Sequence, residues 1–246
     1  MLRTLTSALF ISAACTTSFA QVWDISRDFS AVQEEHDWRY LYSQDGVQQF
    51  MHNYAPEYWN VQYDPAVNPS YWTNISKDSM HPNSVNTSGG RSPVNQQAVL
   101  GWKCGASAHY IIRYRVYKSN TGCGDGVLWE VRKGAGLLEL VNLPFNDNIG
   151  HAASIETDID IAQLVTFTLS PLVNDICDTT GYQAAIFGSC QFDLNRDGLV
   201  DDADFSIFIG AYNDLVTISG DFNSDGFTND ADFLLFVPAY NQLLCP

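Results

Sequence analysis

The last quarter of the chain contains two copies of an oxygen-rich loop, whose side chains suit the binding of a hard divalent cation. The first copy begins at Asp193 and the second begins 28 residues later, at Asp221. Each reads Asp-x-Asn-x-Asp-Gly-x-x-(Asp/Asn)-Asp-Ala-Asp. Calcium takes about six to eight oxygens from positions 1, 3, 5, 7, 9 and 12 of such a loop, and glycine at position 6 makes its turn. The spacing therefore predicts two Ca²⁺ ions, one in each loop.

The predicted ligands are five side chains and one backbone carbonyl in each loop, the carbonyl being at position 7. In the first loop they are Asp193, Asn195, Asp197, Leu199, Asp201 and Asp204. In the second loop they are Asp221, Asn223, Asp225, Phe227, Asn229 and Asp232. Both copies have aspartate at position 12, where glutamate is usual, so the carboxylate there has a shorter arm.

An apolar stripe at helical spacing follows each loop, so each repeat is predicted to be a loop and one helix, half of an EF-hand. The stripes consist of Phe205, Phe208, Ile209 and Tyr212, and of Phe233, Phe236, Val237 and Tyr240. No comparable amphipathic run precedes the first loop. Pro238 lacks an N–H group and is expected to kink or end the second helix.

This duplicated pattern, over about residues 189–246, resembles dockerin type I modules. The resemblance implies two calcium ions and docking onto a cohesin-type domain or cell-surface scaffold, often in an extracellular polysaccharide-degrading assembly. It also implies partner contacts from loop positions 10 and 11, which are Asp202-Ala203 and Asp230-Ala231 here. These acidic pairs depart from the hydroxyl-bearing pairs that are common in the family.

The amino terminus has the pattern of a secretory signal. Arg3 precedes an apolar run over residues 5–14, and residues 18–20 form a small-x-small cleavage site. Residues 1–20 are therefore predicted to be a signal peptide, and the mature protein to be secreted and extracellular or held at the cell surface. No later apolar run reaches the ~20 residues of a membrane span.

Composition limits the classes of partner and the pairing of cysteines. The net charge of −16 argues against nucleic acid, whose phosphates need clustered Lys and Arg. Export would permit disulfides. Cys190 and Cys245 bracket the two repeats and are predicted to pair, since pseudo-symmetric packing of the repeats would bring their ends together. Cys123 and Cys177 fall in loops expected at one end of the amino-terminal domain and could also pair, which leaves Cys104 free.

Residues 21–188 are predicted to form a β-sandwich. Short runs of alternating apolar and polar residues, such as 109–118 and 127–133, are separated by glycine-rich turns. The predicted fold class is therefore mostly β: a jelly-roll-like sandwich with a small α module of two calcium loop–helix repeats at residues 189–246. Aspartates and asparagines gather in the loops at one end; turn formation explains them, and a sugar or further calcium site is the alternative.

Three segments carry a looser resemblance over residues 108–187 and just before them. They are Gly124-Asp125-Gly126-Val127, Asp175-Ile176-Cys177-Asp178-Thr179-Thr180 and His81-Pro82. In these the chain resembles secreted bacterial β-sandwich domains of surface proteins with sorting tails or dockerins. The resemblance implies a jelly roll like those of carbohydrate-binding modules, without a settled activity, and it carries over no catalytic residue.

Aromatic residues are dense between residues 38 and 72 and suggest a surface for glycans, whose C–H faces stack on aromatic rings. Trp38, Tyr40 and Tyr42 alternate and are better explained as the inner face of a strand. The candidates for glycan binding lie in loop-like sequence rich in Pro and Asn, and they are Tyr58, Trp59, Tyr71 and Trp72.

Three functions remain open on the sequence. The first is a noncatalytic, calcium-dependent protein whose sandwich recognises a ligand such as a polysaccharide. The second is a small polysaccharide hydrolase, although the sequence shows no nucleophile, zinc or phosphate-loop motif and pairs no two carboxylates at the ~5–10 Å that a glycosidase needs. The third is a surface-layer or matrix protein whose sandwich binds protein.

Overall fold

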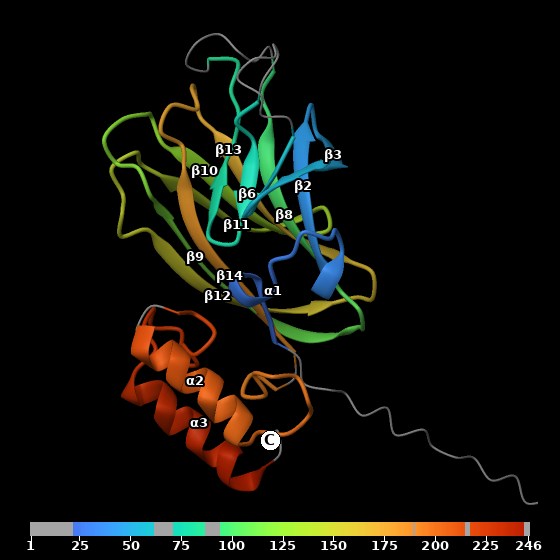
Figure 1. Ribbon diagram of the computed structural model, residues 1–246, viewed down its shortest axis with the longest axis vertical. Coiled ribbons are helices and arrows are strands. Elements are labelled where there is room, and N and C mark those ends of the chain that lie inside the picture. The colour runs from blue at the N-terminus through green and yellow to red at the C-terminus, as the bar shows by residue number, and fades with distance from the viewer. Residues whose placement is uncertain (1–21, 62–70, 87–93, 189, 215–216, 244–246) are drawn as a thin grey trace, which may run out of the picture.

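The computed structural model is a two-layered β-sandwich with a pair of helices packed beside one of its sheets (Figure 1). It describes residues 22–61, 71–86, 94–188, 190–214 and 217–243. The predicted signal peptide, residues 1–20, lies outside these ranges. Within them, no helix has the length and apolar character to cross a membrane. The expectation of a mostly β, two-sheet fold is confirmed.

The larger sheet has eight strands. They are β1 (Val22–Asp24), β4 (Asn53–Ala55), β5 (Tyr58–Asn60), β6 (Asn74–Ser76), β7 (Ser79–His81), β9 (Ala108–Lys118), β12 (His151–Ile159) and β14 (Thr180–Phe187). Their order is β12-β9-β14-β7-β6-β5-β4, and β1 pairs with β14 beside this path.

The smaller sheet has six strands, in the order β11-β10-β13-β8-β2-β3. They are β2 (Trp38–Gln44), β3 (Val47–Phe50), β8 (Gln97–Lys103), β10 (Val127–Lys133), β11 (Gly136–Leu143) and β13 (Leu164–Pro171). The helices are α1 (Ile25–Asp28), the 3-10 turn η1 (Glu35–Asp37), α2 (Asp202–Asp214) and α3 (Asp230–Gln242).

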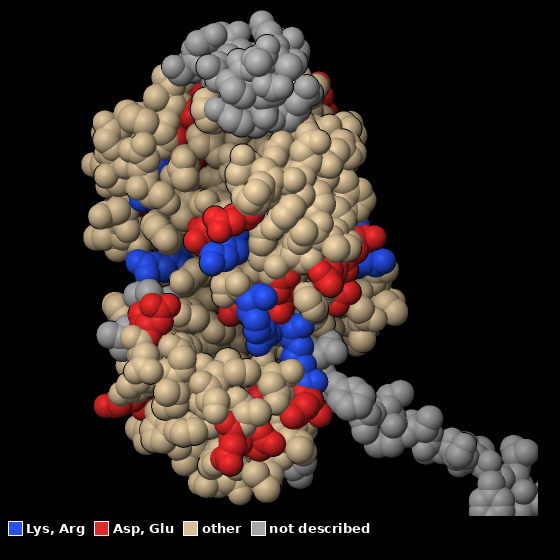
Figure 2. Space-filling model, viewed as in Figure 1, with Lys and Arg blue, Asp and Glu red and all other residues tan. Residues whose placement is uncertain are grey.

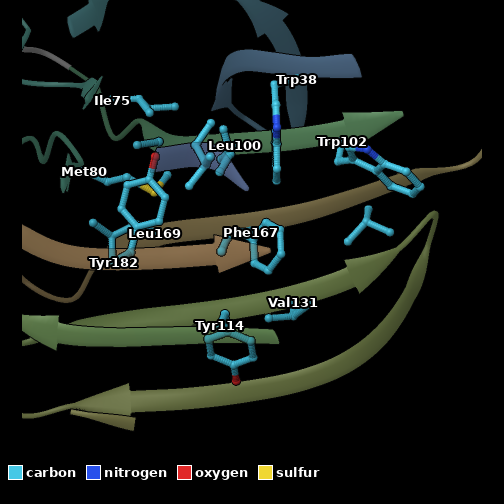
Figure 3. Packing of buried hydrophobic residues seen from close by; sticks show 14 of the residues in the cluster. Trp38, Ile75, Met80, Leu100, Trp102, Tyr114, Val131, Phe167, Leu169 and Tyr182 are labelled. Atoms are coloured by element: carbon cyan, nitrogen blue, oxygen red, sulfur yellow. The ribbon is translucent and has the colours of Figure 1, made fainter. Parts of the chain in front are cut away.

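The main core lies between the two sheets and is rich in large aromatic side chains (Figure 3). Trp38, Trp102 and Trp129 have no exposed surface. The predicted alternation in β9 holds, since Tyr110, Ile112, Tyr114 and Val116 face this core. Arg113 lies on the opposite face of the strand, yet it is only 3 % exposed, because the carboxyl-terminal loops cover that face.

The loops that follow β9, β11 and β13 meet at one end of the sandwich, as strand direction predicts. The Lys118 amide donates to the Asp147 carbonyl at 2.8 Å and the Ser119 amide to the Thr179 carbonyl at 3.2 Å. The predicted Cys123–Cys177 disulfide joins two of these loops. Gly124 has φ +92° beside it, and a Cβ there would lie 2.3 Å from the Ile176 carbonyl oxygen, so only glycine fits.

The other cysteines that the structure describes are Cys104 and Cys190. Cys104 is a buried free thiol, as expected. Its backbone bonds to the turn before β13, with its N–H donating to the Gln163 carbonyl at 2.9 Å. Cys190 is disulfide-bonded. Its predicted partner, Cys245, lies outside the described residues.

A second core joins the carboxyl-terminal helices to the outer face of the larger sheet. Phe208 of α2 and Phe236 of α3 stack with ring centroids 5.3 Å apart at an interplanar angle of 8°. They share a cluster with Val22 of β1 and with Ala185 and Phe187 of β14. Apolar packing is therefore continuous across the boundary predicted near residue 188.

Two details of the helices concern the predicted stripes and Pro238. Of the two predicted effects of Pro238, a kink or an end, the end does not occur, since α3 continues to Gln242. The proline is on the exposed side of the helix, where water can satisfy the carbonyl that loses its partner. Ile209 and Phe233 belong to the stripes that were expected to be buried, but they are 38 % and 37 % exposed, and Ala211, at 6 %, is a buried residue of α2 outside the predicted stripe.

Candidate functional site

The first oxygen-rich loop places three carboxylates around one point. Oxygens of Asp193, Asp197 and Asp204 all lie within 4.8 Å of one another. Backbone N–H groups hold the two buried members. Asp193 accepts from the Arg196 and Gly198 amides at 2.7 and 2.8 Å. Asp204 accepts from the Leu194 amide at 2.6 Å. Backbone hydrogen bonds thus position the Asp193 and Asp204 carboxylates.

The second loop repeats this hydrogen-bond pattern. Asp221 accepts from the Asp225 and Gly226 amides at 3.0 and 2.9 Å, as Asp193 does from the Asp197 and Gly198 amides. Asp232 accepts from the Asn223 amide at 3.0 Å and from the Asn229 amide at 2.9 Å. Gly198 and Gly226 both have φ +91°, the conformation predicted for position 6.

The other predicted ligands build the turns between these anchors. Asn195 accepts from the Asp197 amide, and Asn223 accepts from the Asp225 amide, both at 2.9 Å. Asp201 and Asn229 each accept a 2.8 Å bond from the amide two residues later, at Ala203 and Ala231. Asn229 and Asp232 together form the capping box of α3. Leu199 and Phe227, predicted to contribute carbonyls, have exposed side chains.

Burial raises the pKa of the carboxyl groups at position 1 of both loops and at position 12 of the first. For Asp193, Asp204 and Asp221 the cause is loss of solvation, which the surrounding backbone N–H groups partly oppose. Asp193 and Asp204 have no exposed surface. A buried group of carboxylates is costly without a compensating positive charge, so the donor set fits a hard cation.

Two of the four residues predicted to contact a partner, Asp202 and Asp230, form hydrogen bonds between the two repeats. The Tyr212 hydroxyl of α2 donates to Asp230 at 2.6 Å, and the Tyr240 hydroxyl of α3 donates to Asp202 at 2.5 Å. Each tyrosine thus bonds position 10 of the other repeat. Ala203 and Ala231, at position 11, are exposed. The two tyrosines are also 28 residues apart, so the repeat in the sequence could have indicated that they make equivalent hydrogen bonds.

Arginines connect both loops to the sandwich. Arg27 of α1 donates to the Leu194 carbonyl at 2.5 Å, and Arg113 of β9 donates to the Phe222 carbonyl at 3.1 Å. Arg196, inside the first loop, reaches back to the Val22 carbonyl and to Asp28. Figure 2 shows basic side chains gathered along the boundary between the sandwich and the carboxyl-terminal repeats. Sequence patterns gave no indication of these contacts.

The aromatic candidates separate into one core residue and three pocket residues. Trp59 is 6 % exposed, stacks on Tyr40 and donates from Nε1 to the Ser30 carbonyl at 2.8 Å, so this candidate for glycan binding is a core residue. Tyr58, Tyr71 and Trp72 line a cavity of about 270 Å³. Asn60, Asn74, Ser76 and Ser79 supply polar groups in the same lining. Rings beside amides and hydroxyls form a surface that can stack on and hydrogen-bond to a polar ring.

The acidic residues in the loops at the disulfide end of the sandwich have structural contacts. Asp125 accepts from the Val173 amide at 2.8 Å, and Asp175 accepts from the Ser84 amide at 2.9 Å. Asp178 forms a buried ion pair with Lys118, Nζ to Oδ1 3.3 Å. Burial raises the pKa of Asp178 to about 7, and the Lys118 ammonium opposes the shift. Turn formation and internal pairing therefore account for these side chains.

Comparisons with known proteins find solved structures of low similarity. No protein-family model matches it, and no curated protein does. A family 51 carbohydrate-binding module from Clostridium perfringens, solved with methyl-galactose, matches with TM-score 0.35 at 8 % identity, over 68 % of this chain and 99 % of that one. A family 35 carbohydrate-binding module from Clostridium thermocellum matches with TM-score 0.26 at 11 % identity, over 44 % and 86 %.

A viral protein gives a similar result. The vertex protein P5 of PRD1 matches with TM-score 0.27 at 19 % identity, over 36 % of this chain, which spans 64 % of that protein. Similarity at this level assigns no ligand or activity to the present chain. The functional argument therefore depends on the loops and the pocket themselves.

Proposed function

We propose that the protein is a secreted calcium-binding protein whose two carboxyl-terminal loops each hold one Ca²⁺ ion and whose β-sandwich is a recognition domain. The observation that carries this proposal is the meeting of Asp193, Asp197 and Asp204 oxygens within 4.8 Å, on a backbone scaffold that the second loop repeats. Bound calcium would neutralise the clustered carboxylates and tie each loop to the first turn of its helix.

The proposal predicts that calorimetric titration of the full chain with CaCl₂ gives two ions per molecule. Asp197→Ala and Asp225→Ala should each remove one ion, because each deletes the position 5 carboxylate of one loop. Both side chains are exposed, so the fold does not depend on their burial. Asp45→Asn, in the exposed turn between β2 and β3, is the matched control and should leave two ions. Absence of calcium binding to the unaltered protein would refute the proposal.

Because the repeats resemble dockerin type I modules, we also propose that they bind a cohesin-type domain. Exposed apolar side chains on α3 support it: Leu234 is 70 % exposed, Leu235 43 % and Phe233 37 %. Beside them Phe205, Phe233, Val237 and Tyr240 line a hollow of about 260 Å³. An apolar surface of this kind favours a protein partner. A cell-surface scaffold would be recognised by the same surface.

The aromatic pocket supports carbohydrate binding as a second function of the sandwich. Its described lining is aromatic, amide and hydroxyl, a chemistry that favours a neutral polysaccharide. We expect Tyr58→Ala combined with Trp72→Ala to lower retention on insoluble neutral polysaccharides roughly tenfold, through loss of stacking. Phe145→Ala removes an exposed ring, at 41 %, outside the pocket and should have no effect.

The same experiment separates the three candidate functions. Retention without release of reducing sugar supports the binding domain. Release of sugar by the unaltered protein would instead favour the hydrolase. Equal retention of the unaltered and double-substituted proteins would remove the pocket from the proposal and leave the surface-layer or matrix function, in which the sandwich binds protein.

A further inference from the structure

The sandwich contacts the two calcium loops at equivalent atoms. Leu194 and Phe222 both occupy position 2, and each backbone carbonyl accepts one arginine hydrogen bond, from Arg27 and Arg113 respectively. The two arginines come from unrelated parts of the chain, α1 and β9. The two loops are therefore held at equivalent backbone atoms by two different arginine side chains.

The surroundings of the two arginines differ in charge. Arg27 is partly exposed and lies 3.1 Å from Asp28, which also pairs with Arg196. Arg113 is buried between β9 and the second loop, over the Phe187 ring at 4.5 Å. Its Nη2 donates to the Gln191 amide oxygen at 2.6 Å and to the Phe222 carbonyl. Its Nε and Nη1 have no hydrogen-bond partner among the described residues.

The acidic groups around Arg113 belong to the second loop and to a neighbouring strand. Asp221 lines the same small cavity as Arg113. The charges of Asp221 and Asp232, at positions 1 and 12, and of Glu156 on β12 all act on the guanidinium. This loop also has three aspartates among its five predicted side-chain ligands, whereas the first loop has four. The guanidinium thus partly neutralises the loop with fewer carboxylates.

We propose that Arg113 makes the second loop the weaker calcium site and links its occupancy to its contact with the sandwich. The inference rests on the proposed calcium function. A calcium ion bound by Asp221 and Asp232 would meet a fixed positive charge in a poorly solvated place, where charges interact strongly. At the first loop, Asp28 pairs with both Arg27 and Arg196, and the charge of Asp24 also acts on Arg196, so two carboxylates balance the two arginines there. By linkage, calcium in the second loop weakens the attraction between that loop and Arg113 by the same factor.

The test measures each loop separately by calorimetric titration with CaCl₂ in the full chain. Asp197→Ala leaves the second loop as the intact site, and Asp225→Ala leaves the first. We expect Arg113→Gln to tighten calcium binding about tenfold in the Asp197→Ala protein and to leave it unchanged in the Asp225→Ala protein. Glutamine keeps an N–H donor for the Phe222 carbonyl while removing the charge.

Two further variants keep the result decisive. Arg115→Gln removes a cation from the same face of β9, two residues away, and should not change calcium binding by either loop. Arg113→Lys keeps the charge and should keep the second site weak, which tests the charge even if the glutamine variant folds poorly. Equal affinities of the Gln, Lys and unaltered proteins at the second loop would overturn the inference. No calcium binding by any of them would instead reject the calcium function itself.

Discussion

Chelation of calcium is expected to lower the thermal midpoint of the protein by at least about 10 °C. Ligand binding to the folded state stabilises it by about 4 kcal/mol when the free ion is at a thousand times its dissociation constant. One kcal/mol corresponds to about 2–4 °C for a chain of 150–250 residues. Even with a weaker second site, two ions would supply the expected difference.

The effect should reach the whole chain. Val22 and Phe187 of the sandwich share an apolar cluster with Phe208 and Phe236 of the repeats. Loosening the loops should therefore expose part of the outer face of the larger sheet. Melting is best followed by differential scanning calorimetry in 1 mM CaCl₂, in excess EDTA, and in excess EDTA with MgCl₂.

Magnesium is the informative control for this experiment. It demands near-ideal octahedral geometry and gives up its waters reluctantly, so it should restore little stability in these loops. Equal melting curves with calcium and with EDTA would contradict the prediction. Equal rescue by magnesium would point to general charge screening instead of a calcium site.

Replacing Lys118 by methionine is expected to cost about 3–5 kcal/mol, because removing one partner of a buried ion pair leaves the buried Asp178 carboxyl without its compensating partner. The side chains of Lys118 and Asp178 have no exposed surface. The Lys118 ammonium also donates to the Cys177 carbonyl at 3.0 Å. It therefore connects β9 to the loop that carries the disulfide.

A double substitution distinguishes this loss from a general packing defect. Lys118→Met with Asp178→Leu removes both charges, and an apolar pair of similar volume is often neutral or stabilising relative to a buried ion pair. Denaturant unfolding should therefore find the double variant more stable than Lys118→Met alone. Lys103→Met, on an exposed position of β8, should change stability by less than about 0.5 kcal/mol. A double variant less stable than the single one would argue against charge as the cause.

Sequence patterns predicted those structural elements that depend on residues close together in the chain. The 28-residue repeat located both loops, and alternation located the core face of β9, because each signal lies within a dozen residues. Strand direction also brought Cys123 and Cys177 to one end. Long-range packing was not accessible in this way. Trp59 lies in loop-like sequence and yet stacks on Tyr40, and Arg113 has the pattern of a surface residue. Their burial depends on segments that lie far away in the sequence.

The two loops make different contacts with the sandwich, so the two repeats are not interchangeable along the chain. Position 4 is Arg196 in the first loop and Ser224 in the second. Arg196 lies against the Asp28 carboxylate, whereas Ser224 lines the cavity beside Arg113. Exchanging the two repeats would place a second guanidinium next to Arg113 and leave Asp28 with only Arg27. Although the two repeats share one sequence pattern, each has side chains that fit its own position against the sandwich, and a chain with the repeats exchanged would lose these contacts.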